Sequence, residues 1–150
     1  MGNYILDALG AEEEGFITNY DLGTFPMRVQ SLNRTLIDKV FAVCDYYLLG
    51  KPHRNARHLY DIYKLAEYVE LDDVFMNLVK EVRTHRIEMG SEIAPAAPFD
   101  VNILELVQKI CDEDFYKEDY RETTLKLISD SLEYEMLKQH YKELVERIFA

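Results

Sequence analysis

Few residues of the kinds that keep a chain open occur in this sequence: it has 4 prolines, 6 glycines and no tryptophan. With a hydrophobic content of 48%, this scarcity excludes an unstructured or low-complexity chain. The 2 cysteines are too few for a disulfide framework, and no Cys/His pattern has zinc-site spacing. No apolar run is long enough to cross a membrane, and acidic residues close to Met1 do not fit a secretory signal. We expect one compact domain in the cytoplasm.

Positive charge is also scarce, and the formal net charge is −11. A protein that grips nucleic acid gathers lysines and arginines on one face, so this balance argues against a general nucleic-acid binder. Acidic residues dominate both ends of the sequence, whereas the segment from Lys51 to Arg86 is nearly balanced. A phosphate contact is therefore expected in that segment, and a basic partner protein elsewhere.

Apolar periodicity predicts a mainly α fold, a bundle of about five or six helices preceded by a short β-hairpin-like segment. In that first part, Tyr4 to Leu9 is expected to form a brief helix. Residues Gly15 to Tyr20 and Phe25 to Leu32 are rich in β-formers and flank a turn, so we expect them to pair as strands. Residues 34–150 form the helical bundle in this interpretation.

Capping residues mark where the helices of the bundle begin. Thr35 is predicted to cap a helix that ends at Gly50, Asp72 one that continues to Met89, and Asp100 one that follows a proline-containing loop. Two more helices are expected over Tyr116 to Ile128 and Leu132 to Phe149. The predicted core positions of the first helix are Leu36, Val40, Val43, Cys44, Tyr47 and Leu48.

One further helix combines an apolar face with a dense set of charges. Arg57, Asp61, Lys64 and Tyr68 fall on one stripe, beside an apolar stripe through Leu59. Such a charged stripe is usually a solvated helix face, held by ion pairs worth about 0.3–0.5 kcal/mol each. Spacing alone therefore favours a surface with no special role.

Four motifs change that interpretation when they are taken together. They are Arg-Thr-Leu-x-x-Lys-x-Phe-Ala from Arg34, Asp-Tyr-Tyr from Asp45, Gly-Lys-Pro from Gly50, and Arg-His-Leu-Tyr-Asp-Ile-Tyr-Lys-Leu from Arg57. In this order they resemble the C-terminal helical half of the AbiEii/AbiGii-type nucleotidyltransferase toxins of abortive-infection and toxin–antitoxin systems. The resemblance extends over most of the chain.

The resemblance implies a transferase that uses a nucleoside triphosphate (NTP) and Mg²⁺ to attach nucleotides to an acceptor, which is tRNA in some members. It implies catalytic roles for Lys39 and Asp61, which match a lysine and an aspartate that face the nucleotide in such enzymes. The nucleotide or phosphate contacts would come from Arg54, Arg57, His58 and Lys64. An antitoxin is the further partner that a family of this kind implies.

The metal ligands of such enzymes belong to an N-terminal half with a Gly-Gly or Gly-Ser turn and a later Asp-x-Asp. Here the Gly-Ser is Gly90-Ser91, in a loop, and the Asp-x-Asp is Asp112-Glu-Asp114, at a helix end. Two-metal chemistry needs carboxylates on a rigid support, so we assign no metal ligand. Residues 1–33 would be a remnant of the transferase core. We expect a truncated family member, inactive without its catalytic half or a partner chain.

A second function stays open, that of a non-catalytic acidic helical module that binds a protein partner. Lys39 and Asp61 would then form an ordinary salt bridge between helices. The tyrosines near the candidate site are equally ambiguous: a nucleobase stacks on an exposed tyrosine, but tyrosines also line the boundary of small bundles. They are Tyr46, Tyr47, Tyr60 and Tyr63.

Overall fold

The computed structural model describes residues 29–128 and 132–150, and in these residues the protein is built from helices without strands. The elements are α3 (Leu32–Leu48), α4 (Arg57–Ala66), α5 (Asp73–Glu88), α6 (Ile103–Asp112), α7 (Lys117–Glu122), the 3-10 helix η2 (Thr124–Lys126) and α8 (Tyr134–Phe149). The predicted mainly α fold is confirmed. The hairpin is not supported: Val29 to Ser31 are not a strand and Leu32 begins α3, while the rest of the hairpin and the brief helix over Tyr4 to Leu9 lie outside the described residues.

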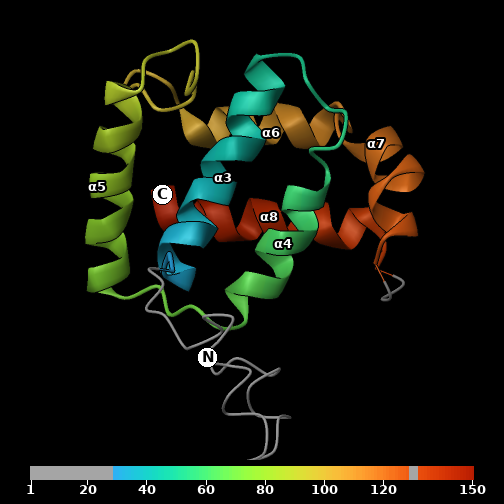
Figure 1. Cartoon of the computed structure of the whole chain (residues 1–150), viewed down its shortest axis with the longest axis horizontal. Helices are drawn as coiled ribbons and strands as arrows, with labels where there is room; N and C mark the ends of the chain where they lie inside the picture. Colours follow the sequence, from blue (N-terminus) through green and yellow to red (C-terminus); the bar gives the residue numbers. More distant parts are fainter. Residues whose placement is uncertain (1–28, 129–131) are drawn as a thin grey trace, which may run out of the picture.

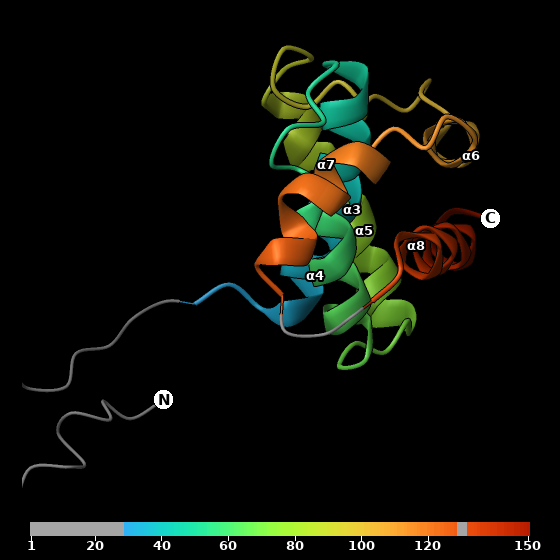
Figure 2. The same cartoon turned by 90° about the vertical axis from the view of Figure 1, so that its right-hand side faces the viewer.

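The helices are arranged in two layers. In Figure 1, α3 lies between α5 and α4, and α6 and α8 cross behind them. Figure 2 shows the molecule from the side, with α6 and α8 end-on and next to each other, while α3, α4 and α5 run lengthwise. The core fills the space between the layers, because α3 contacts α6 and α8 contacts α4.

α3 is the central helix, and this explains its composition. Six of its apolar side chains are almost fully buried: Leu36, Ile37, Val40, Phe41, Val43 and Cys44. A helix that is covered on several sides needs more than one apolar stripe, and each fully buried side chain of this size contributes about 1.5–3 kcal/mol. Most of the predicted face is confirmed, but Leu48 is exposed because it lies in the last turn, at the edge of the bundle.

Some of the helices have N-cap residues other than those predicted. Asp72 caps α5 as expected, since its carboxylate accepts the N–H of Phe75. Thr35 does not cap α3; Ser31 does, by accepting the N–H of Arg34. Asn102, not Asp100, caps α6 through its side-chain oxygen. Serine is a better N-cap residue than threonine, which favours Ser31 over Thr35. Asn102 directly precedes α6, whereas Asp100 does not.

The predicted helix over Tyr116 to Ile128 is shorter than expected. α7 ends at Glu122, and the chain continues through Thr123 into the 3-10 turn η2. The threonines at 123 and 124 are β-branched and disfavour a continued α-helix. α8 occupies most of the range predicted for the last helix.

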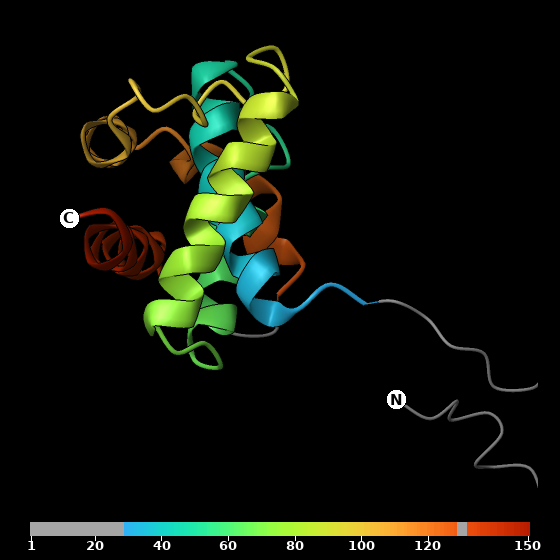
Figure 3. The ribbon, with the colours of Figure 1, turned by 90° about the vertical axis from the view of Figure 1, so that its left-hand side faces the viewer.

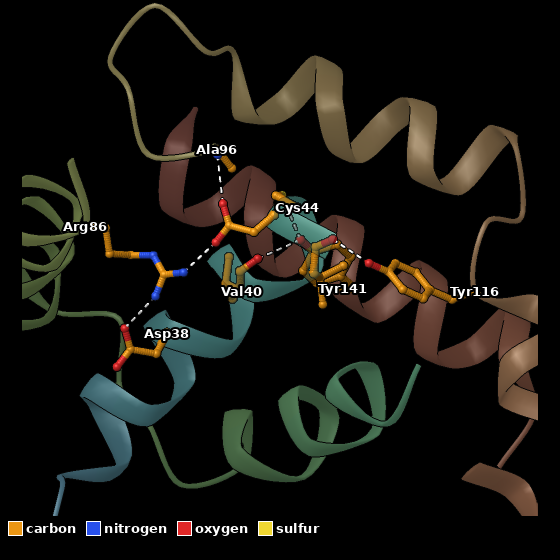
Figure 4. A network of polar contacts seen from close by, with 9 residues as sticks. Asp38, Val40, Cys44, Arg86, Ala96, Tyr116 and Tyr141 are labelled. Atoms are coloured by element: carbon orange, nitrogen blue, oxygen red, sulfur yellow. Dashed lines mark hydrogen bonds and ion pairs between the residues drawn. The ribbon is translucent and has the colours of Figure 1, made fainter. Parts of the chain in front are cut away.

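Tyrosine hydroxyls tie the two layers together inside the core (Figure 4). Tyr141 of α8 donates a hydrogen bond to the carbonyl of Val40, with 3.0 Å between oxygens, and lies 3.3 Å from Cys44 Sγ. Tyr116 donates to the carbonyl of Val43 at 2.6 Å. Buried hydroxyls need such partners. Cys44 and Cys111 are buried free thiols.

The helices described here include none that is both long and apolar enough to cross a membrane.

Candidate functional site

The two residues singled out as catalytic lie against each other at the contact between α3 and α4. Lys39 Nζ donates to Asp61 Oδ2 at 2.7 Å. The side chains keep 24% and 35% of their surface exposed, so solvent reaches the pair. The stripe on α4 is therefore more than a set of local contacts, because its aspartate reaches across to a second helix.

His58 lies one turn before Asp61 and belongs to the same part of α4. Its ring stacks on that of Tyr46 from α3, with ring planes 1° apart and centroids separated by 5.7 Å. Burial lowers the pKa of His58 to about 4, helped by the nearby positive charge of Lys39 and opposed by Asp61. The imidazole is thus neutral at physiological pH and offers the site a hydrogen-bonding group without charge.

Nδ1 of His58 is buried without a hydrogen-bond partner within the described parts of the chain. A buried polar atom left in this way costs roughly 1–3 kcal/mol, and such atoms often mark functional positions. The unpaired nitrogen of His58 is itself buried, in the turn of α4 that precedes Asp61.

Lys64 lies further along α4. Its ammonium is 5.7 Å from the ring centroid of Tyr60 and 5.9 Å from that of Tyr63, within range of cation–π attraction. Tyr60 and Tyr63 are partly buried against the core, as are Tyr46 and Tyr47, which is the position expected of tyrosines at a bundle boundary.

The two arginines stand at the entry to α4 and are exposed. Arg57 is the first residue of the helix, and Arg54 lies in the turn before it with a φ of 63°. That angle is in the left-handed region, which a residue with a side chain adopts only where its surroundings hold it. The structure thus places both cations at the same helix entrance.

The group that holds this entrance comes from α7. Asp119 Oδ1 accepts the N–H of Arg54 at 2.8 Å, and Oδ2 accepts the N–H of Ala56 at 3.0 Å. The sequence alone does not indicate a role for Asp119, because nothing in the local pattern of α7 distinguishes it from neighbouring acidic residues. Only the fold brings it to residues more than sixty positions earlier.

A second charged network lies on α3, on the side that meets α5. Figure 3 shows these two helices side by side, and Figure 4 shows the network. Arg86 of α5 bridges Asp38 at 3.1 Å and Asp45 at 2.5 Å, and Asp45 also accepts the N–H of Ala96. Burial raises the pKa of Asp45, while the bonds from Ala96 and Arg86 oppose the rise. Arg86 lies on the face of α5 that meets α3, because it neutralises a buried carboxylate there.

The described residues do not fit a metal ion. Within residues 29–128 and 132–150 no group of three or more His, Cys, Asp or Glu side chains comes close enough to hold one. Asp114, part of the Asp-x-Asp, instead binds Lys117 at 2.7 Å and Lys138 at 2.5 Å. We therefore derive no step through a metal from these residues.

Comparison with known families gives one result. The model of the family described as "Nucleotidyl transferase AbiEii toxin, Type IV TA system" matches residues 5–150. No curated protein and no solved structure matched the chain.

Proposed function

The chain belongs to the AbiEii nucleotidyl transferase toxin family, and on this premise we propose that it provides the lysine–aspartate wall of a nucleotide site. The proposed reaction is transfer of a nucleotide from an NTP to an acceptor such as tRNA. The Lys39–Asp61 contact at 2.7 Å is the observation that supports it most directly.

Lys39 binds oxygens of the triphosphate in this proposal. An ammonium is a compact positive charge that stabilises negative charge developing on a transferred phosphoryl group. Its partial exposure leaves it accessible to a ligand, and its place at a contact between two helices limits its motion.

Asp61 orients that lysine. In the structure it accepts one hydrogen bond from Lys39 Nζ, and an ammonium has three donors, so two remain for phosphate oxygens.

Arg54, Arg57, His58 and Lys64 are assigned to nucleotide or phosphate contacts. The two arginines are exposed at the entry to α4, and the neutral His58 lies beside the pair. An NTP in this family is used with a divalent metal such as Mg²⁺, whose ligands must come from outside the described residues. A lysine lowers phosphate charge but does not replace a metal.

A titration of the ¹⁵N-labelled chain with GTP, CTP and inorganic triphosphate tests the assignment. We expect binding in the millimolar range, with amide shifts around Lys39 and Arg57 that disappear in Lys39→Ala. Tight binding would show that this chain needs no further part for the nucleotide. Shifts that leave these residues unchanged would remove them from the site.

A second function fits the same contact, that of an acidic helical module that binds a basic protein such as an antitoxin. There the Lys39–Asp61 pair only joins two helices. A nucleotide-transfer assay on toxin that carries Lys39→Ala or Asp61→Asn separates the two functions. A salt bridge without a catalytic role is dispensable for transfer.

A further inference from the structure

Asp119 is almost completely buried, with 7% of its surface exposed, and its carboxylate faces a segment remote in sequence. Each of its two oxygens accepts one backbone N–H, from Arg54 and from Ala56. The hydroxyl of Thr123 donates to the backbone carbonyl of Asp119 at 2.6 Å and also lies 3.2 Å from Oδ1, and His53 Nδ1 lies 3.5 Å from the same oxygen. A buried carboxylate with this many donors is held in one orientation.

These two bonds hold the residues that lead into α4. Ala56, the N-cap residue of α4, has no side chain that accepts a hydrogen bond, and the N–H groups of His58 and Leu59 in the first turn are bound by backbone carbonyls. The carboxylate of Asp119 accepts the N–H of Ala56 itself, and its negative charge suits the positive end of the helix dipole. The same carboxylate holds Arg54 in the left-handed conformation, which is unfavourable for a residue with a side chain.

Asp119 is itself fixed to the core. The hydroxyl of Tyr116, at the start of α7, donates to the carbonyl of Val43 in α3. Tyr120 donates to the carbonyl of Leu132, just before α8. α7 is therefore held in place on two sides. Because Asp119 belongs to α7, its hydrogen bonds also hold the residues before α4 in place.

We propose that Asp119 is a positioning residue, which holds the segment from Lys51 to Arg57 so that Arg54 and Arg57 meet the polyphosphate of a nucleotide together. This inference rests on the proposed function. It also specifies how phosphate is bound: the amides of Arg54 and Ala56 are already used by Asp119, so the contacts come from the guanidinium groups.

Loss of Asp119 also removes stabilising hydrogen bonds, so its effect on binding needs a control of matched structure. Asp45 provides one. It is equally buried, it is a carboxylate, and it accepts a backbone N–H from a loop, that of Ala96 at 2.8 Å. Asp45 faces α5 and the loop before α6, not the entry to α4.

The experiment compares wild type, Asp119→Asn and Asp45→Asn in a titration with inorganic triphosphate, followed by ¹⁵N shifts of the backbone and the arginine Nε groups. Melting temperatures are recorded for all three proteins. We expect Asp119→Asn to weaken triphosphate binding at least threefold and to abolish the shifts of Arg54 and Arg57 Nε. Asp45→Asn also removes a partner of the buried Arg86, so it should lower the melting temperature at least as much and leave the affinity unchanged.

Equal affinities in wild type and Asp119→Asn would overturn the positioning role and leave the proposed function intact. Equal weakening in both variants would also overturn it, because general destabilisation would then explain the effect. Failure of wild type to bind triphosphate would overturn both proposals. If Asp119→Asn does not fold, Thr123→Val removes the hydroxyl that supports Oδ1, and a smaller loss of affinity in the same direction is expected.

Discussion

The carboxylate of Asp45 and the guanidinium of Arg86 form an ion pair inside the bundle, with 4% and 12% of their side chains exposed. The pair joins α3 to α5, and the same arginine extends to Asp38 and covers the ring of Phe41. An isolated charge at this depth is strongly unfavourable, so the two residues depend on each other.

Removal of Arg86 is therefore expected to destabilise the protein severely. Arg86→Met should lower the free energy of unfolding by about 3–5 kcal/mol, because it leaves the buried Asp45 unpaired. Urea denaturation measures the loss. Arg34→Met is the control, since Arg34 is 3.8 Å from Asp38 in a partly exposed pair and should change stability by less than about 1 kcal/mol. Similar losses in both variants would contradict the role given to Arg86.

Lys39→Ala and Asp61→Asn should separate activity from stability. In a preparation of the toxin that transfers nucleotides, we expect each variant to lose nucleotide incorporation into the acceptor. The free energy of unfolding should change by no more than about 1 kcal/mol, because the pair is partly exposed. Lys80→Ala, on an exposed position of α5, should keep full activity. Wild-type incorporation by both site variants would favour the interaction module.

His58 should make stability depend on pH in the acidic range. Its pKa is lowered from 6.5 to about 4 in the folded protein, so the unfolded chain takes up the proton first. Stability is therefore complete above pH 6.5 and falls as the pH decreases toward 4. His58→Asn should flatten this part of the curve of melting temperature against pH. A dependence of undiminished size in the variant would mean that other groups cause it, His140 among them, whose pKa is also lowered by burial.

The two cysteines should be slow to react in the folded protein. Burial raises the pKa of Cys44 to about 12 and that of Cys111 to about 11, so neither forms a thiolate at neutral pH. A disulfide reagent should modify both at a rate set by opening of the structure, and rapidly in denaturant. Fast modification of Cys44 without denaturant would show that the contact between α3 and α8 opens easily.

The helices and the candidate site could be predicted from the sequence to different extents. The apolar periodicity of α3 and the acidic cap of α5 are local signals, and they placed those helices well. The motifs that begin at Arg34 and Arg57 pointed to Lys39 and Asp61, whereas spacing along α4 gave only the neighbours of Asp61 on its own helix. That Asp61 reaches Lys39 depends on the packing of α4 against α3.

The networks formed across long separations could not be found in this way. Arg86 looked like part of an apolar face, and Asp119 like one acidic residue among several in α7. Each has a partner that is distant in sequence, Asp45 for Arg86 and the entry to α4 for Asp119. Periodicity predicts on which face of its helix a side chain lies, but not which residue of another element it contacts.

The hydrogen bond from Tyr141 to Val40 joins residues 101 positions apart, and this has a consequence during synthesis on the ribosome. α3 is made early, with buried positions on the side that α8 later covers. Until α8 has been translated, a nascent chain carries these apolar side chains open to water, where they are targets for chaperones or for aggregation. A pause in translation after α7 would prolong that exposure, because α3 is covered only once α8 has been made.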